Sequence, residues 1–135
     1  MICNDITDVL THAKVTDAWM GLDLGTKTIG IAVSDRLLRS ATPLLTLKRK
    51  KFSYDAQTLL LEAKKREIGA IILGLPLNMD GSEGPRCQST RAFAKNLATL
   101  TDVAIGFWDE RLSTVAAERV LLEADTTRKR RAEVI

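Results

Sequence analysis

The chain has 135 residues, of which 45% are hydrophobic and 27% charged, and its formal net charge is +3 at pH 7. This length suits one domain with a single core, and the composition is that of a soluble globular protein. No apolar run approaches the roughly 18 residues of a membrane-spanning helix. The N-terminus has early acidic residues and lacks the basic segment of a secretory signal. We therefore expect an intracellular, cytoplasmic protein that does not associate with a membrane.

Residues 1–17 show no clean periodicity, and we expect them to form a loose or partly helical extension before a domain spanning 18–135. Two apolar strands are predicted at about 18–24 and 28–35, joined by turn chemistry at 25–27. A third apolar stretch at 41–47 has a proline near its start, which suits an edge strand. The chain thus opens with three strands in succession.

Helices and strands alternate after this point. Ser53 is a candidate cap for a helix that ends before Gly69, since small and apolar residues recur there at helical spacing. The run at 70–74 is typical of a buried parallel strand. A helix at 86–100, a strand at 103–108 and a last helix beginning after Ser113 or Thr114 complete the order βββαβαβα. This order predicts an α/β fold with a mixed five-stranded sheet covered by helices.

Cysteine and histidine usage restricts the chemistry that the chain can support. Cys3 and Cys87 lack metal-binding spacing, so we expect reduced thiols, and His12 is the only histidine. A histidine-based triad and a site with several histidine ligands are therefore disfavoured. Any bound metal must take mainly oxygen ligands, which favours Mg²⁺ or Mn²⁺ over Zn²⁺.

Positive charge is concentrated in two blocks of four residues, Lys48-Arg49-Lys50-Lys51 and Arg128-Lys129-Arg130-Arg131. A single block of this kind is commonly a solvated surface. Two blocks in so small a chain favour a polyanionic partner, because each neutralised phosphate releases counterions. Aromatic residues make up only 4% of the chain, so a nucleic acid would be held by its backbone rather than by base stacking.

Two carboxylates stand near the ends of predicted strands. Asp23 closes the first strand and shares a face with Gly21, while Glu110 follows the last strand and shares a face with Gly106. If these two strands pair, the carboxylates converge and could hold divalent metal ions for phosphodiester cleavage. Turn chemistry at Asp23 and a solvated strand end at Glu110 are the competing interpretations.

A loop between a buried strand and a helix is a further candidate for ligand binding. It runs from Gly74 to Gly84, and Asn78 and Ser82 within it could donate hydrogen bonds to phosphate oxygens. Ligands commonly bind at such loops in open sheets. A long polar connection without a ligand is the equally simple alternative.

Three motifs, in this order, resemble the successive signatures of the YqgF family. They are Asp23-x-Gly25-x-Lys27 with Ile29-Gly30-Ile31-Ala32, then Gly74-Leu75-Pro76 with Gly81-Ser82, then Asp109-Glu110-Arg111-Leu112-Ser113-Thr114. The resemblance covers 18–135. It implies a ribonuclease-H-like fold, similarity to Holliday-junction resolvases and a role in maturation of the 5′ end of 16S ribosomal RNA.

The resemblance also implies site residues. Asp23 and Glu110 match the family's metal-binding catalytic acids. A third family acid, on a C-terminal helix after a basic stretch, has no match here, because Glu133 precedes the expected place and the sequence given stops at Ile135. We expect that last helix to be missing from this sequence. Thr28 stands where arginine is common in the family.

These observations together predict a Mg²⁺- or Mn²⁺-dependent nuclease that hydrolyses phosphodiester bonds in structured RNA, with 5′-end processing of precursor 16S rRNA as its role in ribosome biogenesis. The expected substrate contacts are Lys27, Asn78, Ser82, Arg111, Arg128, Lys129, Arg130 and Arg131. The alternatives are resolution of DNA junctions and a non-catalytic module that binds RNA or the transcription machinery. A nucleotide-binding ATPase is disfavoured, since the chain supplies only one of the two lobes required.

Overall fold

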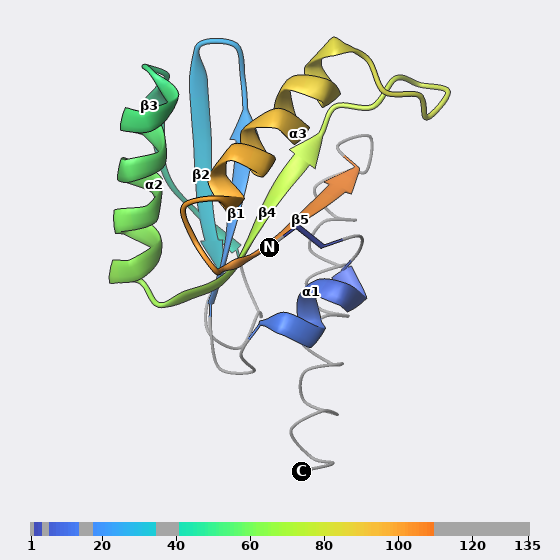
Figure 1. The fold of residues 1–135 in the computed structure, drawn as a ribbon. Helices are drawn as coiled ribbons and strands as arrows, with labels where there is room; N and C mark the ends of the chain where they lie inside the picture. The colour runs from blue at the N-terminus through green and yellow to red at the C-terminus, as the bar shows by residue number, and fades with distance from the viewer. Residues whose placement is uncertain (1, 4–5, 14–17, 35–40, 110–135) are drawn as a thin grey trace.

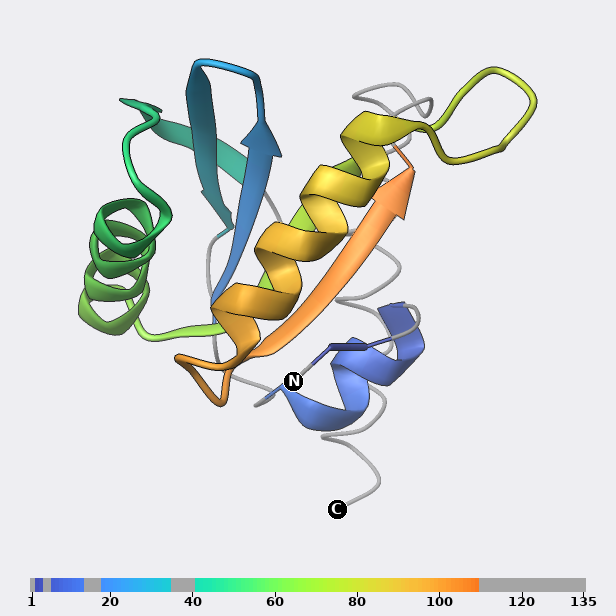
Figure 2. The same cartoon turned by 45° about the horizontal axis from the view of Figure 1, so that its top comes forward.

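A computed structural model describes residues 2–3, 6–13, 18–34 and 41–109. Within these ranges the chain forms one five-stranded sheet and three helices (Figures 1 and 2). Their bounds are α1 Ile6–His12, β1 Ala18–Leu24, β2 Thr28–Ser34, β3 Ala41–Lys48, α2 Phe52–Lys65, β4 Ile68–Leu75, α3 Pro85–Ala98 and β5 Ala104–Asp109. The predicted mixed α/β sheet is confirmed. The predicted helix after Ser113 or Thr114 lies outside the described residues.

The strands lie in the order β3-β2-β1-β4-β5. β1, β2 and β3 form an antiparallel meander, whereas β4 is parallel to both β1 and β5. The hypothesis that the first and last strands pair is therefore wrong, because β4 lies between them. The apolar run of β4 is buried on both faces, and such a run suits the centre of a sheet better than its edge.

The outer strand β3 tolerates a proline because it pairs on one side only. Pro43 lies opposite Ala32, where the register between β2 and β3 shifts. Proline lacks a backbone N–H, so it is compatible with an edge strand and disruptive in a central one. The predicted edge strand is thus confirmed.

Helices α2 and α3 cover one face of the sheet. Leu59 of α2 and Phe93 and Leu97 of α3 pack in one buried cluster with Met20 of β1 and Ile71 of β4. Two details of the predicted helices are wrong. The cap residue of α2 is Lys51 rather than Ser53, with no side-chain capping bond. α3 ends at Ala98 rather than at residue 100, and Leu100, which the predicted helix would have carried on the face of Phe93 and Leu97, is 56% exposed.

The short helix α1 packs against the opposite face of the sheet. Val9 and Leu10 join a second buried cluster that includes Trp19 of β1 and Ala104 of β5. The backbone N–H of Cys3 donates to the carbonyl of Ile105 at 2.7 Å, which ties the N-terminal segment to the last described strand. Part of the expected extension is therefore integrated into the core. No helix in the described ranges is long and apolar enough to cross a membrane.

Candidate functional site

Asp23 lies near the end of β1, and its side chain is exposed. Its neighbours Leu22 and Leu24 point into the cluster under α2 and α3, so alternation along the strand turns Asp23 to the other face. Across the hairpin it faces Gly30, where an added Cβ would lie 3.6 Å from the Cβ of Asp23. Among the described residues, the Asp23 carboxylate has no hydrogen-bond or ion-pair partner, so it is available to a ligand.

The register of the sheet decides which residues lie beside Asp23. Leu22 pairs with Leu73, and Leu73 pairs with Phe107. The next row toward the strand ends therefore runs from Asp23 across β4 to β5, and in it Gly74 pairs with Trp108. Asp23 and Trp108 thus lie on one face with a glycine between them. The predicted partner acid Glu110 lies outside the described residues.

An apolar cleft of about 480 Å³ opens on this face. It extends along β1, β2 and β3, and its lining includes Asp23, Ser34, Ile72 and both tryptophans, Trp19 and Trp108. Trp19 is only 2% exposed, and its indole Nε1 has no hydrogen-bond partner in the described part of the chain. The cleft therefore combines apolar walls with an exposed carboxylate.

Cations gather at the β1–β2 turn, next to Asp23. Lys27 is exposed in the turn, and its carbonyl accepts a hydrogen bond of 2.9 Å from the backbone N–H of Arg49. The Arg49 guanidinium donates to the carbonyl of Gly25 at 2.7 Å, and that of Arg86 donates to the carbonyl of Leu24 at 3.4 Å. Residues up to 62 positions apart thus meet at one turn, which sequence spacing alone did not indicate.

The loop that follows β4 is held by its own polar groups. The side-chain amide of Asn78 donates to the hydroxyl of Ser82 at 3.0 Å, and that hydroxyl donates to Asp80 at 2.6 Å. The backbone N–H of Asn78 also donates to the carbonyl of Ser82 at 2.9 Å. The two predicted contact residues are exposed, but in this structure their hydrogen bonds define the shape of the loop.

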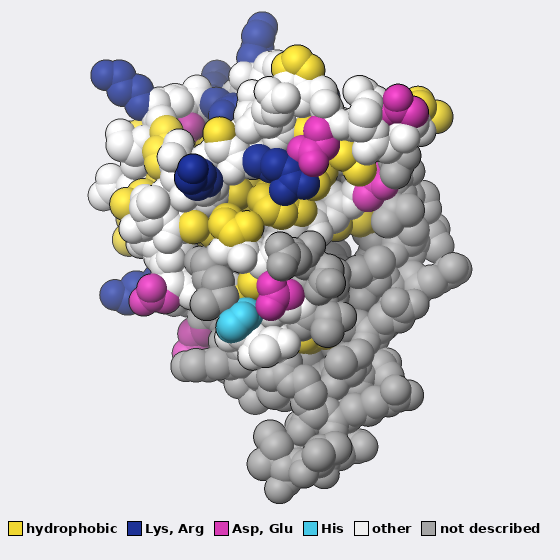
Figure 3. All heavy atoms as spheres, turned by 45° about the vertical axis from the view of Figure 1, so that its right-hand side comes forward, with side chains coloured by type: hydrophobic (Ala, Val, Ile, Leu, Met, Phe, Trp, Pro, Cys, Tyr) yellow, Lys and Arg dark blue, Asp and Glu magenta, His cyan; other side chains and the backbone are white. Residues whose placement is uncertain are grey.

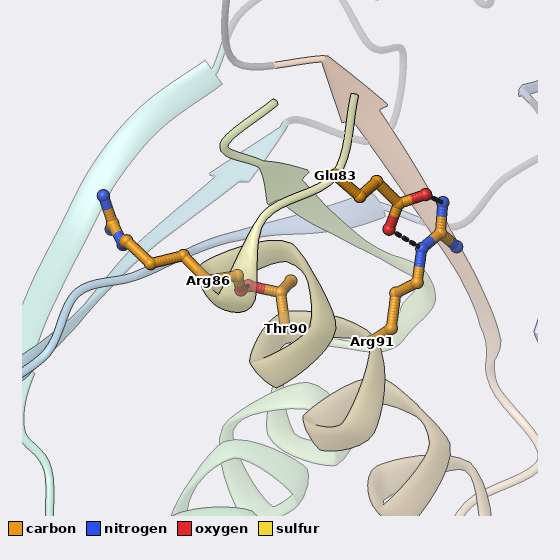
Figure 4. Close-up of polar contacts among 4 residues, drawn as sticks. All are labelled: Glu83, Arg86, Thr90 and Arg91. Atoms are coloured by element: carbon orange, nitrogen blue, oxygen red, sulfur yellow. Dashed lines mark hydrogen bonds and ion pairs between the residues drawn. The ribbon is translucent and has the colours of Figure 1, made fainter. Parts of the chain in front are cut away.

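Arg91 is fixed between the loop and β5. It donates two hydrogen bonds to Glu83, of 2.6 and 2.9 Å, and its guanidinium lies 4.9 Å from the ring centre of Phe107. Figure 4 shows Arg86 and Arg91 extending from α3 in opposite directions. The hydrogen bonds from Arg91 lower the pKa of Glu83 from its ordinary value. The positive charge of Arg91 is therefore paired with a carboxylate, whereas the Arg86 guanidinium contacts a backbone carbonyl.

In the described ranges, no group of three or more histidine, cysteine, aspartate or glutamate residues could hold a metal ion. Of the carboxylates in the described part of the chain, only that of Asp23 lines the cleft. Cys3 and Cys87 are both buried and are not joined in a disulfide, which agrees with the expected reduced thiols. The predicted contacts Arg111, Arg128, Lys129, Arg130 and Arg131 lie outside the described residues. The carboxylate of Asp23 is an oxygen donor of the kind that hard cations such as Mg²⁺ prefer.

Comparisons with known proteins agree on one family. Residues 17–135 match the family model described as "RuvX: Holliday junction resolvase". A Ruegeria pomeroyi protein named "Putative pre-16S rRNA nuclease" is 66% identical over the whole chain and 88% of its own length. A protein of the same name from Ruegeria sp. (strain TM1040) is 70% identical over the whole chain and 86% of its own length.

A solved structure supports the ribonuclease-H-like fold. The chain is similar to Thermus thermophilus RuvC, solved in complex with a Holliday junction substrate, with a TM-score of 0.51 and 12% sequence identity. The match covers 70% of this chain and 66% of that chain, just under two thirds. At this identity the likeness concerns the fold alone.

Proposed function

The chain belongs to the RuvX family, and from this membership we propose that it is a metal-dependent nuclease that hydrolyses phosphodiester bonds in structured RNA. The single observation that carries the proposal is the place of Asp23. Its carboxylate, which has no partner among the described residues, is exposed beside an apolar cleft, in the same cross-strand row as Trp108 of β5. The names of the relatives favour precursor 16S rRNA as the substrate, and hence action in the cytoplasm.

We assign Asp23 and Glu110 as the ligands that would hold Mg²⁺ or Mn²⁺. Such an ion, when bound, activates water and stabilises the leaving oxygen of the phosphodiester. Asp23 supplies its negative charge from a rigid strand, and the adjacent Gly30 carries no side chain that would obstruct a ligand. The cleft wall formed by Trp108 would limit the access of water to one side of the reacting phosphate.

The remaining predicted contacts would orient the substrate. Lys27, exposed in the turn beside Asp23, would bind a phosphate next to the scissile bond. The loop containing Asn78 and Ser82 would contact the substrate as a preformed unit, because its internal hydrogen bonds fix its shape. We further propose that Arg111 and the block at 128–131 bind phosphates by charge.

Asp23→Asn tests this assignment with little change in shape. We expect metal-dependent cleavage of a precursor 16S rRNA fragment to fall at least about 100-fold. Loss of a group that only supports a metal ligand lowers metal affinity or activity about 10–100-fold, and loss of the ligand itself should lower activity further. The melting temperature should stay nearly constant, because the Asp23 side chain is exposed.

Asp102→Asn is the matched control for the same charge change. Asp102 is exposed in the connection before β5. Because β1, β4 and β5 run parallel, it lies at the opposite end of the sheet from Asp23, so the Asp102→Asn variant should leave cleavage unchanged. Wild-type cleavage by Asp23→Asn would remove Asp23 from the mechanism.

The description of the family favours a second candidate, resolution of four-way DNA junctions. This activity would use the same acids, because both reactions break phosphodiester bonds. Cleavage of a precursor rRNA fragment and of a synthetic four-way DNA junction, measured side by side at equal metal concentration, separates the two. Faster cleavage of the DNA junction would reverse the preference stated here.

A further inference from the structure

Six exposed cations surround the β1–β2 turn and the start of α2. We call them the basic ridge: Lys27, Lys48, Arg49, Lys50, Lys51 and Arg86. In the described part of the chain, the carboxylates in ion pairs have other partners, namely His12, Arg66 and Arg91. Asp55, which lies close in sequence, is 3% exposed and accepts the backbone N–H of Lys50. Among the described residues, the ridge therefore presents positive charge that no acid pairs.

Packing and hydrogen bonds hold several of these cations in place. The Arg49 guanidinium, bonded to the Gly25 carbonyl, also lies 5.8 Å from the ring centre of Phe93. The ammonium of Lys50 lies 4.6 Å from the ring centre of Tyr54. Side chains that are already ordered lose less conformational entropy when they bind. Together with Arg86, which donates to the Leu24 carbonyl, Arg49 and Lys50 thus form a preformed part of the ridge.

The ridge continues from the candidate site around the end of the sheet. Asp23 faces the cleft, whereas α2 and α3 pack on the other face. The β1–β2 turn and the starts of α2 and α3 lie at the same end of the molecule (Figure 1). In Figure 3, Lys and Arg side chains lie on the upper part of the surface. A polyanion bound at Asp23 would meet Lys27 and Arg49 first, and the start of α2 next.

We propose that the basic ridge binds the phosphate backbone of a nucleic-acid arm that leaves the cleavage site over the β1–β2 turn. The inference rests on the proposed nuclease function and adds the path of the substrate beyond the scissile bond. A backbone of regularly spaced phosphates suits a row of cations that begins beside the catalytic carboxylate. The ridge would thus select substrates with an arm long enough to reach α2.

Two pairs of consecutive lysines, one just before α2 and one at its end, provide a matched test. Lys50→Gln with Lys51→Gln removes two charges from the ridge. Lys64→Gln with Lys65→Gln removes two charges from the other end of the helix, about 20 Å away at 1.5 Å per residue. Binding of a precursor 16S rRNA fragment is measured by fluorescence anisotropy with EDTA present, across a series of salt concentrations. Melting curves check that both variants fold.

For the ridge variant, we plot the logarithm of the association constant against the logarithm of the salt concentration. We expect the slope to become shallower by about 2, as for the loss of two phosphate contacts. Affinity near 0.1 M salt should fall about tenfold or more, while the control pair keeps the wild-type slope. With a substrate whose duplex arm is cut short, wild type and the ridge variant should bind equally.

Equal slopes for the two variants would overturn the proposal. So would an equal loss with long-armed and short-armed substrates, because the lysines would then act at the cleavage site. Cleavage by the wild-type chain with no ridge effect refutes the ridge and leaves the nuclease function standing. Ridge-dependent binding without any cleavage refutes the nuclease function and leaves the ridge standing.

Discussion

Gly106 of β5 offers a sharp test of how the N-terminal helix is attached. An added Cβ at this position would lie 2.6 Å from Cγ2 of Val9 and 3.2 Å from Cδ1 of Ile72. The first distance is far shorter than a carbon–carbon contact, and Val9 is fully buried. Gly106→Ala should therefore force α1 away from the sheet.

The expected cost follows from two opposing effects. Overpacking a filled core costs about 1–3 kcal/mol, while replacing glycine in a strand gains roughly 0.5–1 kcal/mol. The free energy of unfolding should therefore fall by about 1–2 kcal/mol. For a chain of this size we expect a drop in melting temperature of roughly 3–10 °C. Urea unfolding and calorimetry measure both quantities.

Two further variants make the test specific. Val9→Ala alone should destabilise by about 2 kcal/mol, yet it frees the space that a methyl group at Gly106 needs. The double variant should be more stable than the sum of the single effects by at least about 1 kcal/mol. Gly21→Ala on the same face is the control, because an added Cβ there meets no atom within 4 Å. Additive effects, or a wild-type melting temperature for Gly106→Ala, would refute the packing described here.

Two other predictions concern the pKa of an acid and the cleft. The hydrogen bonds from Arg91 hold the pKa of Glu83 below its ordinary value of 4.5, so the pair contributes stability above about pH 4.5 that is lost as the pH falls through the lowered pKa. The difference in urea midpoint between wild type and Glu83→Gln should accordingly shrink as the pH is lowered from 7 to about 3, and a constant difference would contradict the assignment. Trp19 and Trp108 both line the cleft, so RNA binding with EDTA present should change tryptophan fluorescence emission. The Trp108→Phe variant should show a smaller change. Unaltered emission on saturation with RNA would place the bound substrate elsewhere.

Strands were predictable from sequence because each carries its own signal. β1 and β2 appear as apolar segments on either side of a glycine-containing turn, and β3 contains a proline that only an edge strand accommodates. The start of α2 was less predictable. Ser53 has the residue type of a cap, but the buried carboxylate of Asp55 accepts the backbone N–H of Lys50 instead. Such tertiary burial is invisible to a local pattern.

The role of each small residue could not be read from its position in a strand. Small residues on the same face as the acids, such as Gly21 and Gly106, allow a backbone or a ligand to come close. Gly21 does line the cleft, whereas the space above Gly106 is occupied by Val9. The two glycines differ because α1 packs over Gly106. The segment that forms α1 has no clear periodicity, so its position over β5 could not be predicted. Contacts between residues nearly 100 positions apart leave no signature in local spacing.

The position of β4 changes what the two proposed acids can do. On neighbouring strands their backbones would be about 5 Å apart, and the carboxylates would repel each other directly. With β4 between them, β1 and β5 lie roughly 9–10 Å apart. The row that contains Asp23 crosses β4 at Gly74 and reaches β5 at Trp108. Gly74 carries no side chain, so β4 adds none between the carboxylate and the indole on this face of the sheet. The Gly-Leu-Pro motif therefore has a physical reason to begin with glycine.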